Sequence, residues 1–510
     1  MDAWRSAVLL CSLMVGCGGG LGSETPTPES ELPPAGMPAG GGGDRASAPP
    51  AARPTLGTAH LVKDVFPPSG RPSRTDPGPS SLVDFQGRLF FATHYEDGTH
   101  ALWASDGSEA GTVRVKDFPA LADTTTDLVT ELTPLGSQLF FVAGDAAHGP
   151  ELWVTDGTTG GTRQVKELTP GLGGDSAPYK LTVVGGQLLF FRYIPGTDSG
   201  HTELWRSDGT DAGTVLVRDM GPDSSLSFSQ VLVGNTLYFV FTDAEHGTEL
   251  WKTDGTSEGT VLVKDIQAGP ASAYPAHLRK LGTSVFFLTS TPAYGSELWR
   301  TDGTSEGTVR VRELSADSDG PIPNLMEGPG SQLFLTLSTP SDHLLRLSSL
   351  KVDDTGAVRE RPVATLPNAF SDQPDSDVLL GTSTVAGGRL FFSVNISSSG
   401  PAPRDVQLWM TDGTANGTQQ VSRPLSLSDE FQSELFTLDD RILYSNIGEG
   451  QGLEPWVSDG TAAGTRQLQD LAPGQDFSYP HDFTRVGASV YFTAYTPGHG
   501  AELWVLPLEG

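Results

Sequence analysis

The 510-residue sequence predicts an all-β fold, a β-propeller built from four-stranded antiparallel blades. Three observations lead to this prediction: a segment that returns about every 48 residues, four short β-like runs within each period, and complementary fragments at the two ends of the repeat region. Four strands in about 48 residues is the length of one propeller blade.

The repeated unit is clearest at Glu249, where it reads ELWKTDGTSEGTVLVKD. It returns almost unchanged from Glu151 and from Glu297. Looser copies surround Trp103, Trp205, Trp409 and Trp456, and a truncated copy contains Trp504. Apart from Trp4, every tryptophan belongs to a copy, so the pattern indicates architecture rather than chemistry.

The second β-like run of each period sets the number of blades. It begins at Leu89, Leu139, Leu188, Leu237, Val285, Leu333, Leu390, Ile442 and Val490. These nine starts predict nine blades, although propellers usually have four to eight. Eight blades with one displaced repeat, or two smaller rings, are the alternative arrangements.

The two ends of the repeat region complement each other. The fragment 57–64 reads as the last strand of a blade with nothing before it, whereas 501–505 stops after a third strand. Pairing these fragments closes a ring and leaves no half-sheet exposed. An open solenoid would instead end in polar capping units. We therefore expect the N-terminal strand to complete the C-terminal blade.

The repeated motif has a structural explanation. Alternation along Glu-Leu-Trp places Leu on one face and Trp on the other, so each packs against a different neighbouring sheet. In the following Asp-Gly-Thr turn, the Asp accepts hydrogen bonds from amides one or two residues on. The motif residues assigned to this role are Trp103, Trp153, Asp156, Trp205, Asp208, Trp251, Asp254, Trp299, Asp302, Trp409, Asp412, Trp456, Asp459 and Trp504. Calcium binding is the alternative for the aspartates, but one carboxylate per turn is far short of six to eight oxygens.

The N-terminal region predicts an exported, anchored protein. Residues 1–16 resemble a lipoprotein signal peptide, with an apolar run too short to cross a bilayer that ends in Leu-Met-Val-Gly before Cys17. Cys17 is the predicted lipidation site, and 17–54 is a Gly/Pro/Ser-rich tether that cannot bury enough surface to fold. The propeller then occupies 55–510. The expected location is the cell envelope, as an outer-membrane or cell-surface lipoprotein, or the medium if Cys17 is not acylated.

Composition excludes some functions. The net charge of −30 argues against nucleic-acid binding, because no basic footprint is present. The two cysteines, Cys11 and Cys17, both lie near the N-terminus, so the remainder has no disulfide or thiolate metal site. We expect no cofactor, with calcium as the alternative.

The motif Glu-Leu-Trp-x-x-Asp-Gly-Thr with its downstream Gly-Thr resembles the ELWxxDGT repeat family of secreted or lipid-anchored bacterial proteins, common in myxobacteria. The resemblance covers roughly Thr55 to Gly510. It implies no activity. Three copies depart from it: Ala101-Leu102-Trp103 lacks the Glu, Pro455 replaces the Leu, and the sixth copy, through His343 to Arg346, has neither Trp nor Asp-Gly-Thr.

The irregular sixth period is the best place to look for a specific site, although drift in a redundant repeat also explains it. Asp372, Asp375 and Asp377 nearby are weak calcium candidates, with a solvated polar loop as the simpler interpretation. No Ser-His-Asp, Cys-His, metalloprotease or phosphate-loop pattern is recognisable.

The sequence therefore predicts a lipid-anchored cell-envelope propeller that acts as a binding or scaffold module. The alternative is an extracellular propeller enzyme, a polysaccharide hydrolase or lyase, with a site at the mouth of the central channel. A purely structural surface protein is the third interpretation. Expected partners are the membrane, through the lipid, and a glycan or protein ligand, with the chain a monomer.

Overall fold

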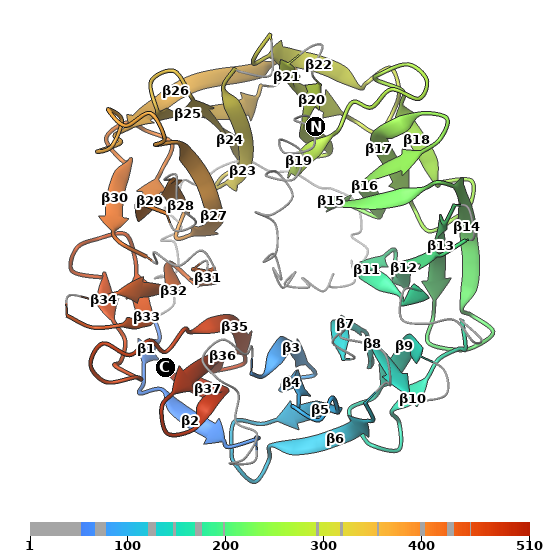
Figure 1. The fold of residues 1–510 in the computed structure, drawn as a ribbon, viewed down its shortest axis with the longest axis vertical. Helices are drawn as coiled ribbons and strands as arrows, with labels where there is room; N and C mark the ends of the chain where they lie inside the picture. Colours follow the sequence, from blue (N-terminus) through green and yellow to red (C-terminus); the bar gives the residue numbers. More distant parts are fainter. Residues whose placement is uncertain are drawn as a thin grey trace, which may run out of the picture.

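The computed structural model describes residues 53–66, 78–120, 129–145, 149–168, 176–196, 199–291, 295–316, 320–353, 356–397, 403–425, 433–448 and 450–510. Nine antiparallel sheets form one closed ring around a central axis (Figure 1). The predicted propeller with nine blades is confirmed, and the alternatives of eight blades or two rings are excluded. All nine predicted second strands are present.

Each blade runs from an inner strand at the axis to an outer strand at the rim of the ring. The inner strands of blades one to nine are β3 (Ser80–Phe85), β7 (Thr130–Leu135), β11 (Tyr179–Val184), β15 (Ser225–Val233), β19 (Ala276–Leu281), β23 (Ile322–Gly328), β27 (Val378–Ala386), β31 (Leu435–Leu438) and β35 (His481–Val486). The second strands are β4 (Arg88–His94), β8 (Gln138–Asp145), β12 (Gln187–Ile194), β16 (Thr236–Asp243), β20 (Ser284–Thr291), β24 (Gln332–Thr339), β28 (Arg389–Ile396), β32 (Arg441–Ile447) and β36 (Ser489–Thr496).

The third strands carry the repeat motif: β5 (His100–Ser105), β9 (Gly149–Thr155), β13 (His201–Ser207), β17 (Gly247–Thr253), β21 (Gly295–Thr301), β25 (Leu344–Val352), β29 (Asp405–Thr411), β33 (Leu453–Ser458) and β37 (Gly500–Glu509). The outer strands of the first eight blades are β6 (Val113–Phe118), β10 (Arg163–Gln164), β14 (Val215–Pro222), β18 (Val261–Lys264), β22 (Val309–Glu313), β26 (Val358–Leu366), β30 (Gln419–Ser422) and β34 (Arg466–Gln467). We call the edge of the ring at which inner strands begin the entry rim, and the opposite edge, with the Asp-Gly-Thr turns, the turn rim.

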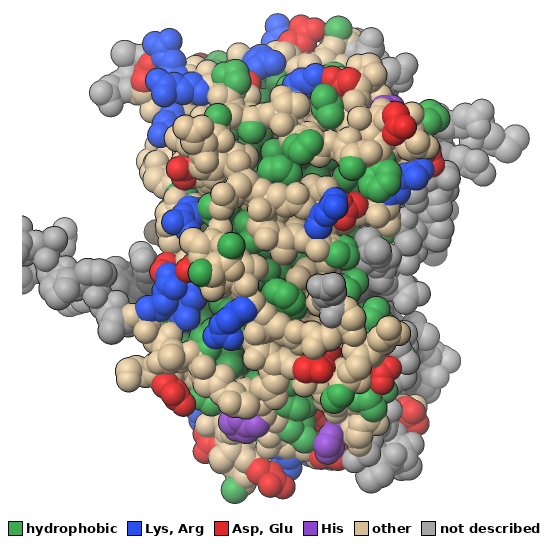
Figure 2. Space-filling model, turned by 90° about the vertical axis from the view of Figure 1, so that its left-hand side faces the viewer, with side chains coloured by type: hydrophobic (Ala, Val, Ile, Leu, Met, Phe, Trp, Pro, Cys, Tyr) green, Lys and Arg blue, Asp and Glu red, His purple; other side chains and the backbone are tan. Residues whose placement is uncertain are grey.

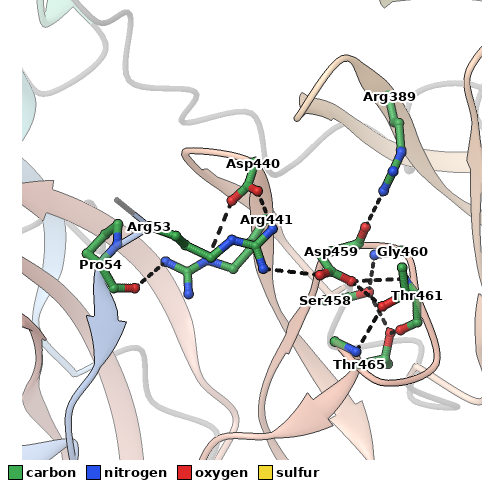
Figure 3. A network of polar contacts seen from close by, with 11 residues as sticks. Arg53, Pro54, Arg389, Asp440, Arg441, Ser458, Asp459, Gly460, Thr461 and Thr465 are labelled. Atoms are coloured by element: carbon green, nitrogen blue, oxygen red, sulfur yellow. Dashed lines mark hydrogen bonds and ion pairs between the residues drawn. The ribbon is translucent and has the colours of Figure 1, made fainter. Parts of the chain in front are cut away.

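The ninth blade is completed by the N-terminal strands, as expected. Both β1 (Thr55–Leu56) and β2 (His60–Lys63) pair with β37, with Thr55 opposite Glu509 and His60 opposite Val505. Side chains reinforce this junction (Figure 3). Arg53 forms ion pairs with Asp440 and Asp459 of blade eight, and Arg441 donates to the carbonyl of Pro54.

The hydrophobic core is divided into layers between blades. The motif leucines lie in the layer shared with the following blade, as Leu250 does with Val285 and Phe287. The motif tryptophans lie in the layer shared with the preceding blade, as Trp251 does with Leu189 and other blade-three residues. The alternation predicted from Glu-Leu-Trp is therefore confirmed, and each blade is held by both neighbours.

Blade six keeps four strands although its sequence has lost the motif. The register places Arg346, Leu347 and Ser348 where other blades carry Glu, Leu and Trp, which is three residues beyond the start of the degenerate copy in the sequence. Strands β25 and β26 are each nine residues long and replace the Asp-Gly-Thr turn with an extended hairpin. The extra spacing therefore adds strand length rather than an irregular insertion.

The outer wall mixes charges of both signs. Figure 2 shows basic and acidic side chains interspersed with apolar ones over the left-hand side of the ring in Figure 1. The described residues contain no helix of the length and apolarity needed to span a bilayer. The predicted signal peptide 1–16, Cys17 and most of the tether 17–54 lie outside the described residues.

Candidate functional site

The Asp-Gly-Thr segments are self-contained turns. In blade two, Asp156 Oδ1 accepts hydrogen bonds from the backbone N of Thr158 at 2.9 Å and from its hydroxyl at 2.7 Å. The hydroxyls of Thr155 and Thr162 then meet at 2.7 Å and close the turn. The two hydrogen bonds from Thr158 lower the pKa of the Asp156 carboxyl. The same bonds occur at Asp208, Asp254, Asp302, Asp412 and Asp459, so each of these aspartates accepts hydrogen bonds within its own turn.

The glutamate of the motif has a function that the sequence did not reveal. In blades two, four and eight, its carboxylate accepts backbone amides seventeen or eighteen residues on, at Leu168, Gln267, and Leu471 with Ala472. In blade nine, Glu502 accepts the amides of Val65 and Phe66 instead. The N-terminal segment thus reproduces this contact as well as the missing strand.

Blades three, five and seven use the same position differently. Glu203, Glu297 and Gln407 accept the indole N–H of the tryptophan two residues on, at 2.8 to 2.9 Å. Where the glutamate binds downstream amides, the indole N–H of Trp153, Trp251, Trp456 and Trp504 has no partner among the described residues. In these seven blades the side chain at this position therefore binds either the downstream amides or the tryptophan.

Burial makes these carboxyls unusual acids. Removal from water raises the pKa of Glu249 and of Glu454 to about 7. It raises the pKa of Glu502 to about 9, helped by the neighbouring Asp64. Perturbed acids can mark active sites, but these three lie in different blades and bind backbone amides. They are structural groups.

The calcium candidates do not converge. Asp375 accepts a hydrogen bond from Arg404 at 2.5 Å, and Asp377 lies 3.5 Å from His343 Nδ1. Asp372 is exposed in the preceding turn. Within the described ranges, no three His, Cys, Asp or Glu side chains gather closely enough to hold a metal ion.

A set of inner-strand residues, the axial ring, lies eight residues before the first residue of the second-strand run, where most of the inner strands bulge. Ser81, Glu131, Lys180, His277 and Asp482 have φ between 53° and 59°, in the left-handed region, and each lies within a register shift. Ser229 and Glu434 occupy the equivalent positions of blades four and eight by spacing. Nothing in the hydrophobic pattern predicted this bulge.

The axial ring joins neighbouring inner strands. The Glu131 carboxylate accepts the amides of Lys180 and Leu181, both at 3.2 Å. Ser229 accepts from Leu278, and Glu434 from Phe483. Each side chain therefore binds the strand of the next blade. This arrangement satisfies backbone groups that the bulge removes from the sheet ladder.

Titratable axial residues have shifted acidities. Burial raises the pKa of Glu434 to about 7, with a contribution from the charge of Asp482, and burial also raises the pKa of Asp482. Burial lowers the pKa of His277 to about 4, assisted by Arg279. Adjacent buried carboxyls of this kind keep their protons to a higher pH than free carboxyls do.

The entry rim carries the most exposed large apolar side chains. Phe228, in the bulge of β15, is 68% exposed, and Tyr274, just before β19, is 54% exposed. Ile322, at the start of β23, is 45% exposed. Lys180 Nζ lies 5.4 Å from the Phe228 ring centroid, across the boundary between blades three and four. These three exposed side chains come from the consecutive blades four, five and six, which makes this part of the entry rim the candidate interaction site.

Two tyrosines on this rim have strained backbones. Tyr274 and Tyr479 have φ of 49° and 45°, and each precedes a proline at the start of an inner strand. A residue before proline favours extended structure, and left-handed non-glycine residues cost on the order of 1–3 kcal/mol. Such strain is found at functional sites. The Tyr-Pro dipeptide shared by 274 and 479 is the sequence signal that could have located them.

Comparison with known proteins found only remote structural similarity. No protein-family model matches the chain, and no curated protein matches it. Among solved structures, a prolyl endopeptidase matches with TM-score 0.41 and 14% identity over 76% of this chain and 55% of that one. A prolyl oligopeptidase B from Galerina marginata matches with TM-score 0.40 and 10% identity, covering 72% and 54%. A puromycin-hydrolysing peptidase from Mycobacterium tuberculosis matches with TM-score 0.41 and 10% identity, covering 84% and 61%.

The expected function needs correction. These solved proteins are peptidases rather than binding scaffolds, and this finding corrects the expected binding or scaffold role; it does not concern the lipid anchor. The present chain spans less than two thirds of each solved chain, and at 10–14% identity no activity passes to it from them.

Proposed function

We propose that the ring admits extended polypeptide along the inner strand β15, as the substrate-selecting part of a peptide-hydrolysing system. The observation that supports this most is the exposed Phe228 in the bulge of that strand, beside Lys180 of the preceding blade.

Strand β15 differs from its neighbours in its accessibility. It is nine residues long, and none of its residues is buried. Among the described strands it pairs only with β16, so the backbone N–H and C=O groups on its other edge have no strand partner. Such an edge accepts an extended peptide through main-chain hydrogen bonds. A glycan cannot supply an amide ladder.

Side chains at the entry rim would provide selectivity. Phe228 and Tyr274 come from adjacent blades, whose inner strands β15 and β19 are linked by the bond from the Leu278 amide to Ser229. Aromatic anchors contribute large contact area at low entropic cost. We expect apolar side chains of the peptide to contact these rings, with an acidic one near Lys180.

Fluorescence anisotropy with a labelled, permanently unfolded polypeptide, such as reduced and carboxymethylated lactalbumin, tests this proposal on the full chain. Phe228→Ser and Tyr274→Ser should each weaken binding by about tenfold, as expected of an aromatic hot spot. Val113→Ser, at an exposed site on the outer strand of blade one, is the matched control. Equal binding by all variants, or none by the wild type, would reject the proposal. A labelled-casein assay measures hydrolysis separately.

We also propose that Cys17 is lipidated and holds the protein at the cell envelope, and that the repeats belong to the ELWxxDGT family. The residues supporting the anchor are Leu13 to Cys17. Replacing Cys17 with Ser should move the protein from the membrane fraction to the medium. Retention in membranes would exclude the anchor and leave the polypeptide proposal unaffected.

A further inference from the structure

Two histidines face each other at the entry-rim hairpin of blade one. His94 ends β4 and His100 begins β5, and the two are direct cross-strand partners. The amide of Tyr95 donates to the carbonyl of Thr99 at 2.9 Å, which places the hydrogen-bonded pair just beyond them. His94 and His100 therefore form a non-hydrogen-bonded pair, in which cross-strand side chains approach most closely.

Their ring nitrogens are already close. His94 Nδ1 lies 3.1 Å from His100 Nε2 and 3.4 Å from His100 Nδ1, with the ring centroids 4.4 Å apart. His100 is 4% exposed and thus fixed by its surroundings, whereas His94 is open to solvent. The ring nitrogens of His100 are therefore held in place, whereas the His94 ring can rotate.

We propose that His94 and His100 form a bidentate site for a borderline divalent transition ion such as Zn²⁺. Two imidazole nitrogens that bind one tetrahedral zinc at roughly 2.0–2.1 Å are about 3.3–3.4 Å apart. The observed separation of 3.1 Å is within a few tenths of an ångström of this span, and the exposed His94 ring would rotate to aim its lone pair at an ion shared with His100. Imidazole is a preferred ligand for this class of ion.

The hairpin turn is organised for this role. Asp97 Oδ1 accepts hydrogen bonds from the amide and the hydroxyl of Thr99, at 3.0 Å and 2.6 Å, so the turn is preformed. The exposed carboxylates of Glu96 and Asp97 add negative charge beside His94. Water would complete the coordination, because the site has two protein ligands.

Zinc titration by calorimetry on the full chain tests the inference, with both cysteines alkylated, no histidine tag, and excess calcium present to occupy the acidic surface. The wild type should bind one zinc ion at a saturable site, and zinc should raise its melting temperature. His94→Gln, at the exposed position, should lower the affinity at least about tenfold.

His60→Gln, at an exposed histidine of β2, is the matched control and should bind zinc as the wild type does. Melting in the absence of zinc shows whether each variant is folded. If the wild type binds no zinc above the level of His94→Gln, the contact is a hydrogen bond between two imidazoles and the metal site is rejected.

Discussion

The second glycine of each Asp-Gly-Thr-x-x-Gly-Thr segment is required by the aspartate that starts the turn. A Cβ placed on Gly161 would lie 2.1 Å from Asp156 Oδ1, and equivalent contacts of 2.0–2.1 Å occur at Gly111, Gly213, Gly259, Gly307, Gly417 and Gly464. The carboxylate thus rests on the glycine backbone. This steric reason explains why the two residues recur together.

Gly161→Ala should destabilise the protein by roughly 1–3 kcal/mol, because the new methyl group must displace the hydrogen-bonded carboxylate. A methyl group added to the adjacent Gly160 would meet no atom within 4 Å, and this residue has no positive φ, so Gly160→Ala is an exacting control. Thermal melting of both variants measures the difference in stability between them. Equal melting temperatures would show that the turn accommodates the methyl group without loss of stability.

Glu249 predicts an unusual pH dependence. Its pKa is raised by burial to about 7 in the folded protein, from 4.5. Between these values the unfolded chain ionises while the folded protein keeps its proton, so this residue's contribution to stability falls as pH rises from 4.5 to 7.

Glu249→Gln cannot ionise, so its melting temperature should fall less than that of the wild type as pH rises over this window. The exposed Glu258→Gln controls for the loss of one negative charge. Identical pH profiles for wild type and Glu249→Gln would contradict the assigned protonation. The turn aspartates act oppositely: their lowered pKa values provide stability above the ordinary Asp range that is lost in acid.

At the scale of the element, the tryptophan-bearing strand joins two blades. Trp153 packs edge-on against Phe118 of blade one, with centroids 5.1 Å apart, and is 7% exposed. Blade six holds Ser348 in the equivalent place and compensates with longer strands.

Trp153→Ala should cost about 3–5 kcal/mol through lost burial and the resulting cavity. Ser348→Ala, at the equivalent place in blade six, should change stability by less than about 0.5 kcal/mol. Differential scanning calorimetry measures both. A small loss for Trp153→Ala would mean that the layers between blades are held mainly by the leucine and phenylalanine side chains.

The outer edges are protected against pairing with other chains. β10 and β34 are only two residues long, whereas the nine-residue β26 carries Arg359, Arg361 and Pro362 in exposed positions. Short strands, charges and proline are recognised protections for exposed edges. The inner strand β15 lacks comparable protection at its bulge, where Phe228 lies, which fits its proposed role.

At the scale of the whole molecule, closure is the decisive feature. Deleting 55–64 would remove β1 and β2, expose the edge of β37, and leave the Glu502 carboxylate without the amides of Val65 and Phe66 in their present positions. The melting temperature should fall and aggregation should increase. Arg53→Ala, which removes both ion pairs of this half-exposed arginine, should cost about 1 kcal/mol or less. An unchanged melting temperature for the deletion would show that closure is dispensable.

The fold could be predicted from the sequence because the same short pattern recurs many times. One short apolar run is ambiguous, but nine such runs about 48 to 57 residues apart indicate the number of blades, and the complementary end fragments indicate closure. In blade six the position equivalent to the motif tryptophan could not be assigned from the sequence because, without Trp or Asp-Gly-Thr, only cross-strand register locates Ser348.

The axial ring and the histidine pair could not be predicted from the sequence. The axial residues Ser81, Glu131, Lys180, His277 and Asp482 share a backbone bulge rather than a residue type, so no side-chain pattern reveals them. The pair His94 and His100 lies six residues apart across a hairpin, and its contact depends on pairing register. Both features depend on which residues strand pairing brings together, whereas the ring of blades follows from the repeats in the sequence.

Thr55, at the start of the first described strand, pairs with Glu509, at the end of the last one. Because the first and last described strands are neighbours, a short peptide could join them, and new termini could be cut between any two blades without breaking a sheet. Such circular permutants should assemble the same ring, since the cyclic succession of blades defines this molecule rather than the place where translation starts.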